Sequence, residues 1–218
     1  MLMSSLKILC IICVIFAFGC AKKQTGEIML PYYLDATFTP VWFESDDVPD
    51  DLHQIAPFEF TNQEGNLVNN DSLSGKIYVA NFFFTVCPSV CPRMTANLER
   101  VQNEFTNDGS VLLISHSVMP WVDSVAAIKS YALEKGIKSS KWHLVTGDKS
   151  KIYSLARNSY FADEGFGKSV TGESDFLHTE NIVLVDPLGH LRGVYNGTIP
   201  LEMARLIEDI YRLKKEFT

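Results

Sequence analysis

Continuous apolar runs mark the interior strands of this chain. Three such runs, rich in β-branched and aromatic residues, occupy residues 76–84, 110–118 and 142–147. Uninterrupted runs of this length are typical of strands that are buried on both faces of a sheet. Shorter alternating patterns on either side of residues 64–65 and of residues 186–189 predict two β-hairpins.

Helical spacing separates these runs. Apolar residues recur every three or four positions between residues 90 and 105, which predicts an amphipathic helix there. Asp123 is expected to cap a second helix over 124–135, a short helix is expected over 149–158, and Pro200 opens a last helix. The inward face of that last helix is expected to comprise Leu201, Ala204, Ile207, Tyr211 and Lys214.

The order of these elements is hairpin, β, α, β, α, β, α, hairpin, α. Strands that alternate with helices imply a partly parallel sheet covered on both faces, and the closing hairpin adds antiparallel strands. The order therefore predicts an α/β chain with a thioredoxin-like fold. We expect a central mixed sheet flanked by helices, with an N-terminal hairpin and a late β-hairpin.

The N-terminal segment is typical of an export signal. Lys7 precedes the short apolar run ILCIICVIFAF, which is too short to span a bilayer comfortably. Gly19-Cys20 follows and resembles a bacterial lipobox, although Ala17 stands where that box usually has Leu. We expect Cys20 to be cleaved to the N-terminus and lipidated, and the alternative is an uncleaved membrane anchor.

Both alternatives place the body of the protein outside the cytoplasmic membrane. The expected location is the cell envelope of a bacterium, as a membrane-anchored lipoprotein that faces the periplasm. The expected organisation is a lipoprotein signal peptide over 1–19, a tether or strap over 20–52 and the folded domain over 53–218.

Composition narrows the class of partner. The chain has 218 residues, is 46% hydrophobic and carries a formal net charge of -7, so it can build a substantial core. Binding to nucleic-acid phosphates needs clustered Lys and Arg, and the chain has no such cluster on this acidic background. We therefore expect no nucleic-acid partner.

Two cysteines stand out in the predicted domain. Cys87 and Cys91 lie in FFFTVCPSVCP, at the predicted turn from the first buried strand into the first helix. A helix N-terminus lowers a thiol pKa, which assists both disulfide exchange and metal ligation. A structural disulfide that closes so small a loop would add little stability. A redox pair, two ligands of a metal site and a structural disulfide all remain open.

A metal site would need a further ligand, and two histidines are candidates. His116 follows the apolar run LLIS at the carboxyl end of a predicted strand, and His178 lies in a loop that enters the penultimate strand. His53 is assigned to the strap, His143 to a strand, and His190 to a hairpin turn in which we expect it to be solvated. From the residues alone, the choice between His116 and His178 stays open.

Two motifs carry a family resemblance. FFFTVCPSVCP and FLHTENIVLVDPLG together resemble the Sco/SenC family of thioredoxin-like, copper-binding cytochrome c oxidase assembly proteins, over about residues 55–215. The resemblance implies that Cys87, Cys91 and His178 bind one copper ion, as Cu(I) or Cu(II). It also implies subunit II of cytochrome c oxidase as the partner that receives copper, or has its cysteines reduced, at the copper A site. A second thioredoxin-like protein is the expected reductant of the pair.

One segment departs from the family pattern. SHSVMP places Met119 where the family often has an acidic residue before the proline, and Asp123 follows later. His116, in the same segment, is therefore the first candidate for a supporting role around the copper site. A copper-independent thiol-disulfide reductase of the cell envelope is the main alternative function. A lipoprotein interaction module with a structural Cys87–Cys91 disulfide is a third.

Overall fold

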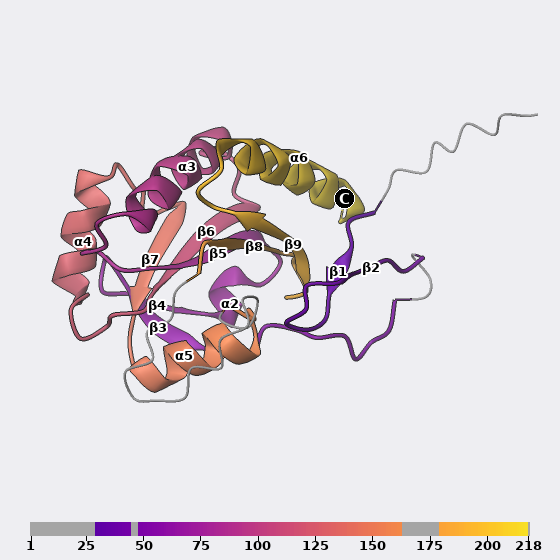
Figure 1. Ribbon diagram of the computed structural model, residues 1–218, viewed down its shortest axis with the longest axis horizontal. Helices are drawn as coiled ribbons and strands as arrows, with labels where there is room; N and C mark the ends of the chain where they lie inside the picture. The colour runs from indigo at the N-terminus through magenta and orange to yellow at the C-terminus, as the bar shows by residue number, and fades with distance from the viewer. Residues whose placement is uncertain (1–28, 45–47, 163–178, 218) are drawn as a thin grey trace, which may run out of the picture.

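The computed structural model describes residues 29–44, 48–162 and 179–217. None of the helices in these ranges combines the length and the apolar character that crossing a membrane requires. In chain order the elements are β1 (Tyr32–Tyr33), β2 (Pro40–Val41), β3 (Glu59–Asn62), β4 (Leu67–Asn69), α2 (Asn70–Leu73), β5 (Ile77–Phe83), α3 (Val90–Glu104), β6 (Val111–Ser117), α4 (Val125–Glu134), β7 (Trp142–Thr146), α5 (Lys149–Asn158), β8 (Asn181–Val185), β9 (Leu191–Asn196) and α6 (Pro200–Glu216) (Figure 1).

A seven-stranded mixed sheet forms the centre of the domain. Its strand order is β4-β3-β7-β6-β5-β8-β9, with β5, β6 and β7 parallel to one another. The β3–β4 and β8–β9 hairpins add antiparallel strands at the two sides. Every residue of β5 is buried, as its uninterrupted apolar run predicts. The predicted mixed sheet with an early and a late hairpin is confirmed.

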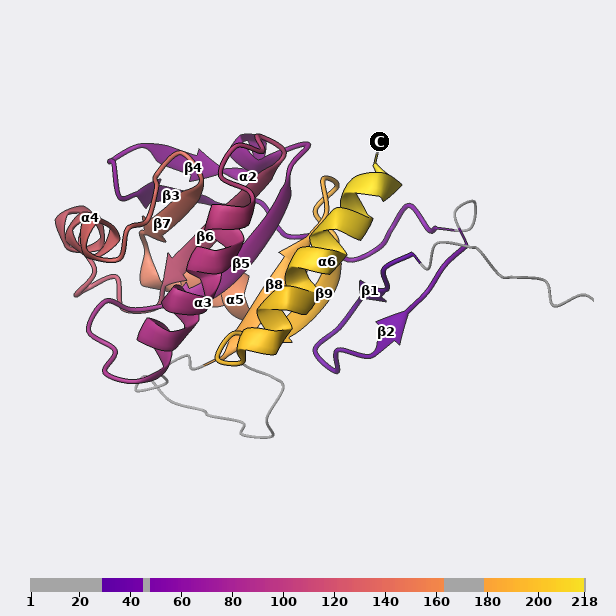
Figure 2. The ribbon, with the colours of Figure 1, turned by 90° about the horizontal axis from the view of Figure 1, so that it is seen from above.

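Helices cover both faces of the sheet, and each face has its own hydrophobic cluster. Side chains of α3, α4 and α6 pack on one face, where α3 and α6 lie side by side (Figure 2). Side chains of α2 and α5 pack on the other. The predicted core positions of α3 are all buried, namely Met94, Leu98, Val101 and Phe105.

Two helical predictions are wrong in detail. Helix α4 is capped by Ser124, whose side chain accepts a hydrogen bond from Ala127 N at 3.2 Å, and not by Asp123. Helix α6 turns a different face inward, and Leu201 of the expected face is 76% exposed. Both faces carry apolar residues, and the one with the bulkier set packs on the sheet. That set comprises Met203, Leu206, Ile210 and Leu213.

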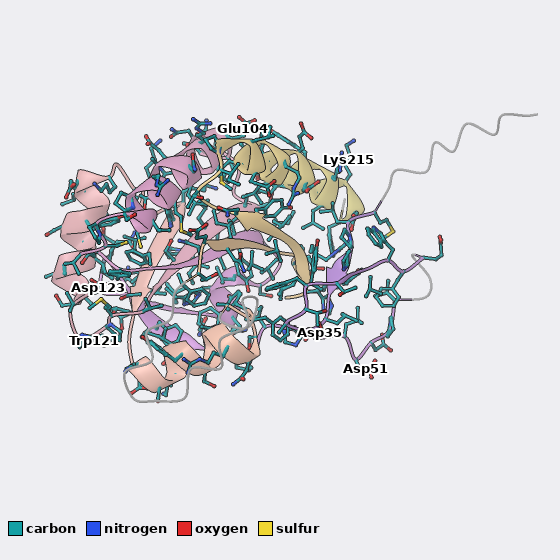
Figure 3. The ribbon with its side chains drawn as sticks, viewed as in Figure 1. Asp35, Asp51, Glu104, Trp121, Asp123 and Lys215 are labelled. Carbon is teal, nitrogen blue, oxygen red and sulfur yellow. The ribbon has the colours of Figure 1, made fainter. Side chains whose placement is uncertain are left out.

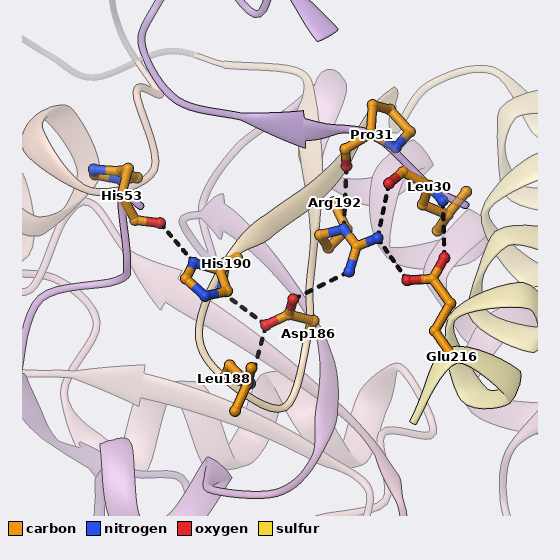
Figure 4. Close-up of polar contacts among 8 residues, drawn as sticks. All are labelled: Leu30, Pro31, His53, Asp186, Leu188, His190, Arg192 and Glu216. Carbon is orange, nitrogen blue, oxygen red and sulfur yellow. Dashed lines mark hydrogen bonds and ion pairs between the residues drawn. The ribbon is translucent and has the colours of Figure 1, made fainter. Parts of the chain in front are cut away.

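A buried ion-pair cluster closes the edge of the sheet where β5 begins (Figure 4). Arg192 is 1% exposed, and its guanidinium contacts Asp186 at 3.2 Å and Glu216 at 2.6 Å. The same guanidinium donates hydrogen bonds to the carbonyl oxygens of Leu30 and Pro31, at 2.7 and 3.2 Å. We call these five residues the Arg192 cluster. It joins β9, the end of α6 and the strap.

The strap lies against this cluster. The Tyr32 ring sits 4.0 Å from the Arg192 guanidinium carbon, and Leu30 N donates to Glu216 at 2.8 Å. Nearby, His190 is 6% exposed and its Nδ1 lies 3.0 Å from the carbonyl oxygen of His53. The expectation that His190 is solvated is therefore wrong, because the segment that includes His53 covers the hairpin turn.

Candidate dithiol site

The two cysteines lie where the central strand β5 passes into α3. We call residues 84–91 the cysteine loop. In the described part of the chain, the N-cap residue Ser89 makes no side-chain hydrogen bond to the first turn of α3. Instead, Cys91 N donates to Cys87 Sγ at 3.4 Å. A sulfur atom therefore takes the place that a capping oxygen usually holds at a helix N-terminus.

The hydrogen bonds at this position favour the thiolate of Cys87. Burial acts to raise the pKa of Cys87, but backbone N–H groups of Cys91, Ser89 and Val90 outweigh it and leave the pKa below its ordinary value. Hydrogen bonds to the charged form of a group stabilise that form. Cys87 is also partly exposed, so a reagent or partner can reach it.

Cys91 has the opposite character. It is 5% exposed and lies in the hydrophobic cluster under α3. Burial, together with hydrogen bonding to Cys87, raises the pKa of Cys91 to about 12. Both residues are free thiols in the structure. One accessible thiol of low pKa above one buried thiol of high pKa is an arrangement suited to thiol-disulfide exchange, in which the first thiol attacks and the second resolves.

Sequence reasoning missed the residue that ties the cysteine loop to the next strand. Asp123 is fully buried, and its carboxylate accepts hydrogen bonds from the Thr85 hydroxyl and the Ser117 hydroxyl, both at 2.5 Å. Figure 3 shows Asp123 beside Trp121, at the end of the molecule near α4. Met119 contributes its carbonyl oxygen, which accepts from Asp123 N at 2.8 Å.

His116 does not lie with the cysteines. Its ring packs among Phe58, Phe60, Phe82 and Tyr160, on the face of the sheet covered by α5. Cys91 belongs to the cluster on the opposite face. Neither ring nitrogen of His116 has a hydrogen-bond partner among the described residues, and burial lowers its pKa to about 3. Among the described residues, His116 therefore makes no contact with Cys87 or Cys91 through which a supporting role could act.

His178 lies outside the described residues. Within the described ranges, no group of three or more His, Cys, Asp or Glu side chains is placed to hold a metal ion. The chain resumes at Thr179 and enters β8, which pairs antiparallel with β5 through Ala80 and Val183. The start of β8 is therefore at the edge of the sheet where β5 ends and the cysteine loop begins.

A mixed sheet with parallel central strands and a dithiol at the first strand-to-helix junction defines a thioredoxin-like dithiol protein. Comparison with known proteins assigns this member of the class to a family. The family model described as SCO1/SenC matches residues 47–215, and the chain belongs to that family.

Relatives agree with this assignment. The SCO1 protein homolog of Bacillus subtilis (strain 168) is 32% identical over 160 residues, which cover 72% of this chain and 81% of the homolog. The crystal structure of a SCO1/SenC family lipoprotein from Bacillus anthracis has 28% identity and a TM-score of 0.65, covering 74% of this chain and 95% of that one.

Two further solved structures come from proteins whose binding or role is named. BsSco, described as a member of the Sco family of cytochrome c oxidase assembly proteins with a disulfide switch, has 29% identity and a TM-score of 0.63, covering 75% of this chain and 94% of that one. Bradyrhizobium japonicum ScoI with copper bound has 28% identity and a TM-score of 0.53, covering 70% of this chain and 96% of that one. The predicted family and the thioredoxin-like fold are confirmed.

Proposed function

We propose that this protein binds one copper ion, as Cu(I) or Cu(II), through Cys87, Cys91 and His178, and that it serves the assembly of the copper A site of cytochrome c oxidase. The observation that carries the proposal is the pair of free thiols at the start of α3, with one accessible and the other buried beside it. Copper delivery and reduction of the cysteines in oxidase subunit II are the two roles that this pair supports.

The donor set fits copper. Thiolate sulfur is a soft ligand that prefers Cu(I), and imidazole binds copper in either oxidation state. The two cysteines are in direct contact, because Cys91 N donates a hydrogen bond to Cys87 Sγ at 3.4 Å. His178 is bonded to Thr179, which leads into β8 at the edge of the sheet where the cysteine loop lies. Chain continuity therefore supports His178 as the third ligand.

Copper binding is tested on the reduced full chain. Titration with Cu(I) and Cu(II) is expected to give one ion per chain above the baseline of the Cys87→Ser/Cys91→Ser variant, which corrects for Cys10, Cys13 and Cys20. Cu(II) is expected to give thiolate-to-copper charge-transfer absorption. His178→Ala should weaken binding and alter this spectrum, and His143→Ala, on β7, is the matched control. An unchanged spectrum in His178→Ala would sink the ligand assignment.

A copper-independent thiol-disulfide reductase is the second candidate, and the contrasting pKa values of the two thiols favour it. In such a reaction the Cys87 thiolate attacks one sulfur of a partner disulfide, the partner S–S bond breaks, and a mixed disulfide forms. The other partner sulfur leaves as a thiolate, which takes up a proton. Cys91 then loses its proton and displaces the partner thiolate. The partner gains two electrons, and Cys87 and Cys91 become a disulfide. Stopped-flow reduction of a disulfide-bonded copper A domain by the metal-free protein tests this. A rapid rate that His178→Ala leaves unchanged favours the reductase.

The protein also needs an anchor and a source of electrons. We propose that Cys20 carries lipid and holds the domain at the outer face of the cytoplasmic membrane, and that the solved SCO1/SenC lipoprotein of Bacillus anthracis supports this by similarity. A thioredoxin-like protein of the envelope is the proposed reductant of the thiols. Mass spectrometry of the mature N-terminal peptide, with Cys20→Ser as the control, tests the anchor.

A further inference from the structure

Asp123 is a buried carboxylate held by neutral donors. It is 0% exposed, and no Lys or Arg in the described parts of the chain forms an ion pair with it. Its oxygens accept from the Thr85 hydroxyl, from Thr85 N at 3.2 and 3.3 Å, and from the Ser117 hydroxyl. Burying a charge is unfavourable unless donors replace its water, and here they do so.

The donors come from two segments that are distant in sequence. Ser117 ends β6, whereas Thr85 belongs to the cysteine loop, 38 positions before Asp123. The neighbouring residue Ser124 already caps α4, so capping does not explain the burial of Asp123. Its carboxylate instead fastens the cysteine loop to the end of β6. The backbone extends this link, because Val118 N donates to the carbonyl oxygen of Phe83 at 2.9 Å.

Thr85 lies next to the atoms that hold both thiols. The carbonyl oxygen of Phe84 accepts from Cys87 N at 3.3 Å. The backbone of Phe84 also acts on the Cys91 thiol, where it lowers the pKa against the effect of burial. A change in the position of Thr85 therefore moves Phe84, and with it the hydrogen bond to Cys87 N and the backbone group that acts on the Cys91 thiol.

We propose that Asp123 is a positioning residue for the dithiol: through Thr85 it holds the cysteine loop in the conformation in which Cys87 Sγ accepts the N–H of Cys91. The inference rests on the dithiol of the proposed function, and it requires neither copper nor a partner. Met119, at the place where the family often has an acidic residue, leaves Asp123 as the buried carboxylate in this turn.

Three variants test the proposal in the reduced, metal-free full chain. Asp123→Asn weakens the acceptor, and Thr85→Val removes one donor from the cysteine loop. Ser117→Ala removes a donor to the same carboxylate outside that loop and is the matched control. Thermal unfolding measures stability. Amide exchange at Cys91 and the rate of Cys87 alkylation by iodoacetamide at pH 7 measure the geometry of the site.

We expect Asp123→Asn and Thr85→Val to speed amide exchange at Cys91 by about ten-fold, since each releases about one hydrogen bond there. Alkylation of Cys87 should slow by several-fold, because its thiolate loses an N–H donor. Ser117→Ala should lower the unfolding temperature similarly but leave both rates within about two-fold. The double variant Asp123→Asn/Thr85→Val should equal the stronger single variant, as expected for one shared contact.

The proposal is overturned if Thr85→Val leaves both rates at the wild-type value, or if Ser117→Ala changes them as much. Either result would mean that Asp123 stabilises the fold but does not position the dithiol. Should Asp123→Asn fail to fold, the comparison of Thr85→Val with Ser117→Ala still tests whether the contact between Thr85 and Asp123 positions the dithiol. These rates are independent of metal, so failure of the wild-type protein to bind copper would overturn the proposed function and leave this inference standing.

Discussion

The two ends of strand β5 solve the problem of buried charge in different ways. At the end where β5 begins, Asp186 meets the Arg192 guanidinium, which also binds Glu216 and two strap carbonyls. At the end where β5 finishes, Asp123 is equally buried, and its partners among the described residues are hydroxyl and backbone donors. The first end is closed by opposite charges, and the second by hydroxyl and backbone donors from the cysteine loop and the end of β6.

This difference suggests that the end where β5 begins contributes mainly to stability, whereas the end where β5 finishes controls the reactivity of the thiols. Proteins place groups with unmet or weakly met requirements where chemistry takes place, and satisfied networks elsewhere. The cysteine end also carries His116, which has no hydrogen-bond partner in the described structure and lies level with Phe82 near the end of β5. We expect changes at the Arg192 cluster and at His116 to alter the free energy of unfolding, and changes at Thr85 and Asp123 to alter thiol chemistry as well.

The largest expected loss in the free energy of unfolding comes from a change in the Arg192 cluster. Arg192→Met should lower the free energy of unfolding by about 3–5 kcal/mol, because it leaves two carboxylates buried without their cation. Urea denaturation at pH 7 measures the loss. Lys129→Ala, which breaks an exposed pair with Glu64, is the control and should cost less than about 1 kcal/mol. A loss for Arg192→Met as small as that of the control would contradict the comparison.

His116 should make the protein sensitive to acid. Its pKa is about 3 in the folded state, below the ordinary value of 6.5, so the unfolded chain takes up a proton first as the pH falls. The contribution of neutral His116 to the free energy of unfolding is fully present well above pH 6.5 and is lost progressively as the pH falls toward 3. The loss from this group is about 2 kcal/mol between pH 6.5 and pH 5.

The variant His116→Phe isolates this contribution. It should stabilise the protein by about 1 kcal/mol at pH 7, because an unsatisfied imidazole is replaced by a ring without polar atoms. It should also flatten the dependence of stability on pH relative to the wild type. Denaturation at several pH values measures both effects. The smaller replacement His116→Leu is the control for steric strain caused by the larger phenylalanine ring. Identical pH profiles for wild type and variants would refute the assignment.

The two thiols should differ in reactivity. Cys87 should react with iodoacetamide at least about ten-fold faster than Cys91 at pH 8, because only Cys87 combines a lowered pKa with exposure. Peptide mass spectrometry after brief labelling measures the ratio, and Cys87→Ser and Cys91→Ser identify the two sites. Equal labelling would mean that the buried position of Cys91 is not kept in solution.

The smallest expected effect on stability comes from weakening the contact between the strap and Glu216 of α6. Glu216→Gln should cost about 1 kcal/mol, since Arg192 keeps Asp186 and the variant keeps an oxygen for Leu30 N. Amide exchange should accelerate several-fold at Leu30, because an amide oxygen is a weaker acceptor than a carboxylate, and should stay unchanged at Cys91. Glu202→Gln, in a surface pair with Arg205, is the control. Acceleration at Cys91 as well would show that the two ends of β5 are coupled.

Local patterns predicted most of the fold. The apolar run of β5 and the spacing of Met94 and Leu98 in α3 each specify an element without reference to distant residues. The position of the dithiol followed from these two elements. The inward face of α6 was missed because two neighbouring apolar stripes compete, and packing on the sheet chooses between them.

The errors share one physical cause, which is contact across long separations. Asp123 and Ser124 are both good capping residues, and the contact of Asp123 with Thr85, 38 positions away, helps to decide which of them is buried. The strap partners of Arg192 lie 161 and 162 positions away. No local pattern contains such information. The role of His178 remains a prediction from the family resemblance, because that residue lies outside the described part of the chain.

The Arg192 cluster also has a mechanical consequence. The chain that precedes Leu30 meets the domain at this cluster, while the thiols lie one length of β5 away, roughly 20 Å for a strand of seven residues. A tension applied along the N-terminal segment would enter through β9 and α6 and bypass the cysteine loop. If the anchor proposed at Cys20 pulls on that segment, the force would act on the Arg192 cluster and leave the geometry of the cysteine loop unchanged.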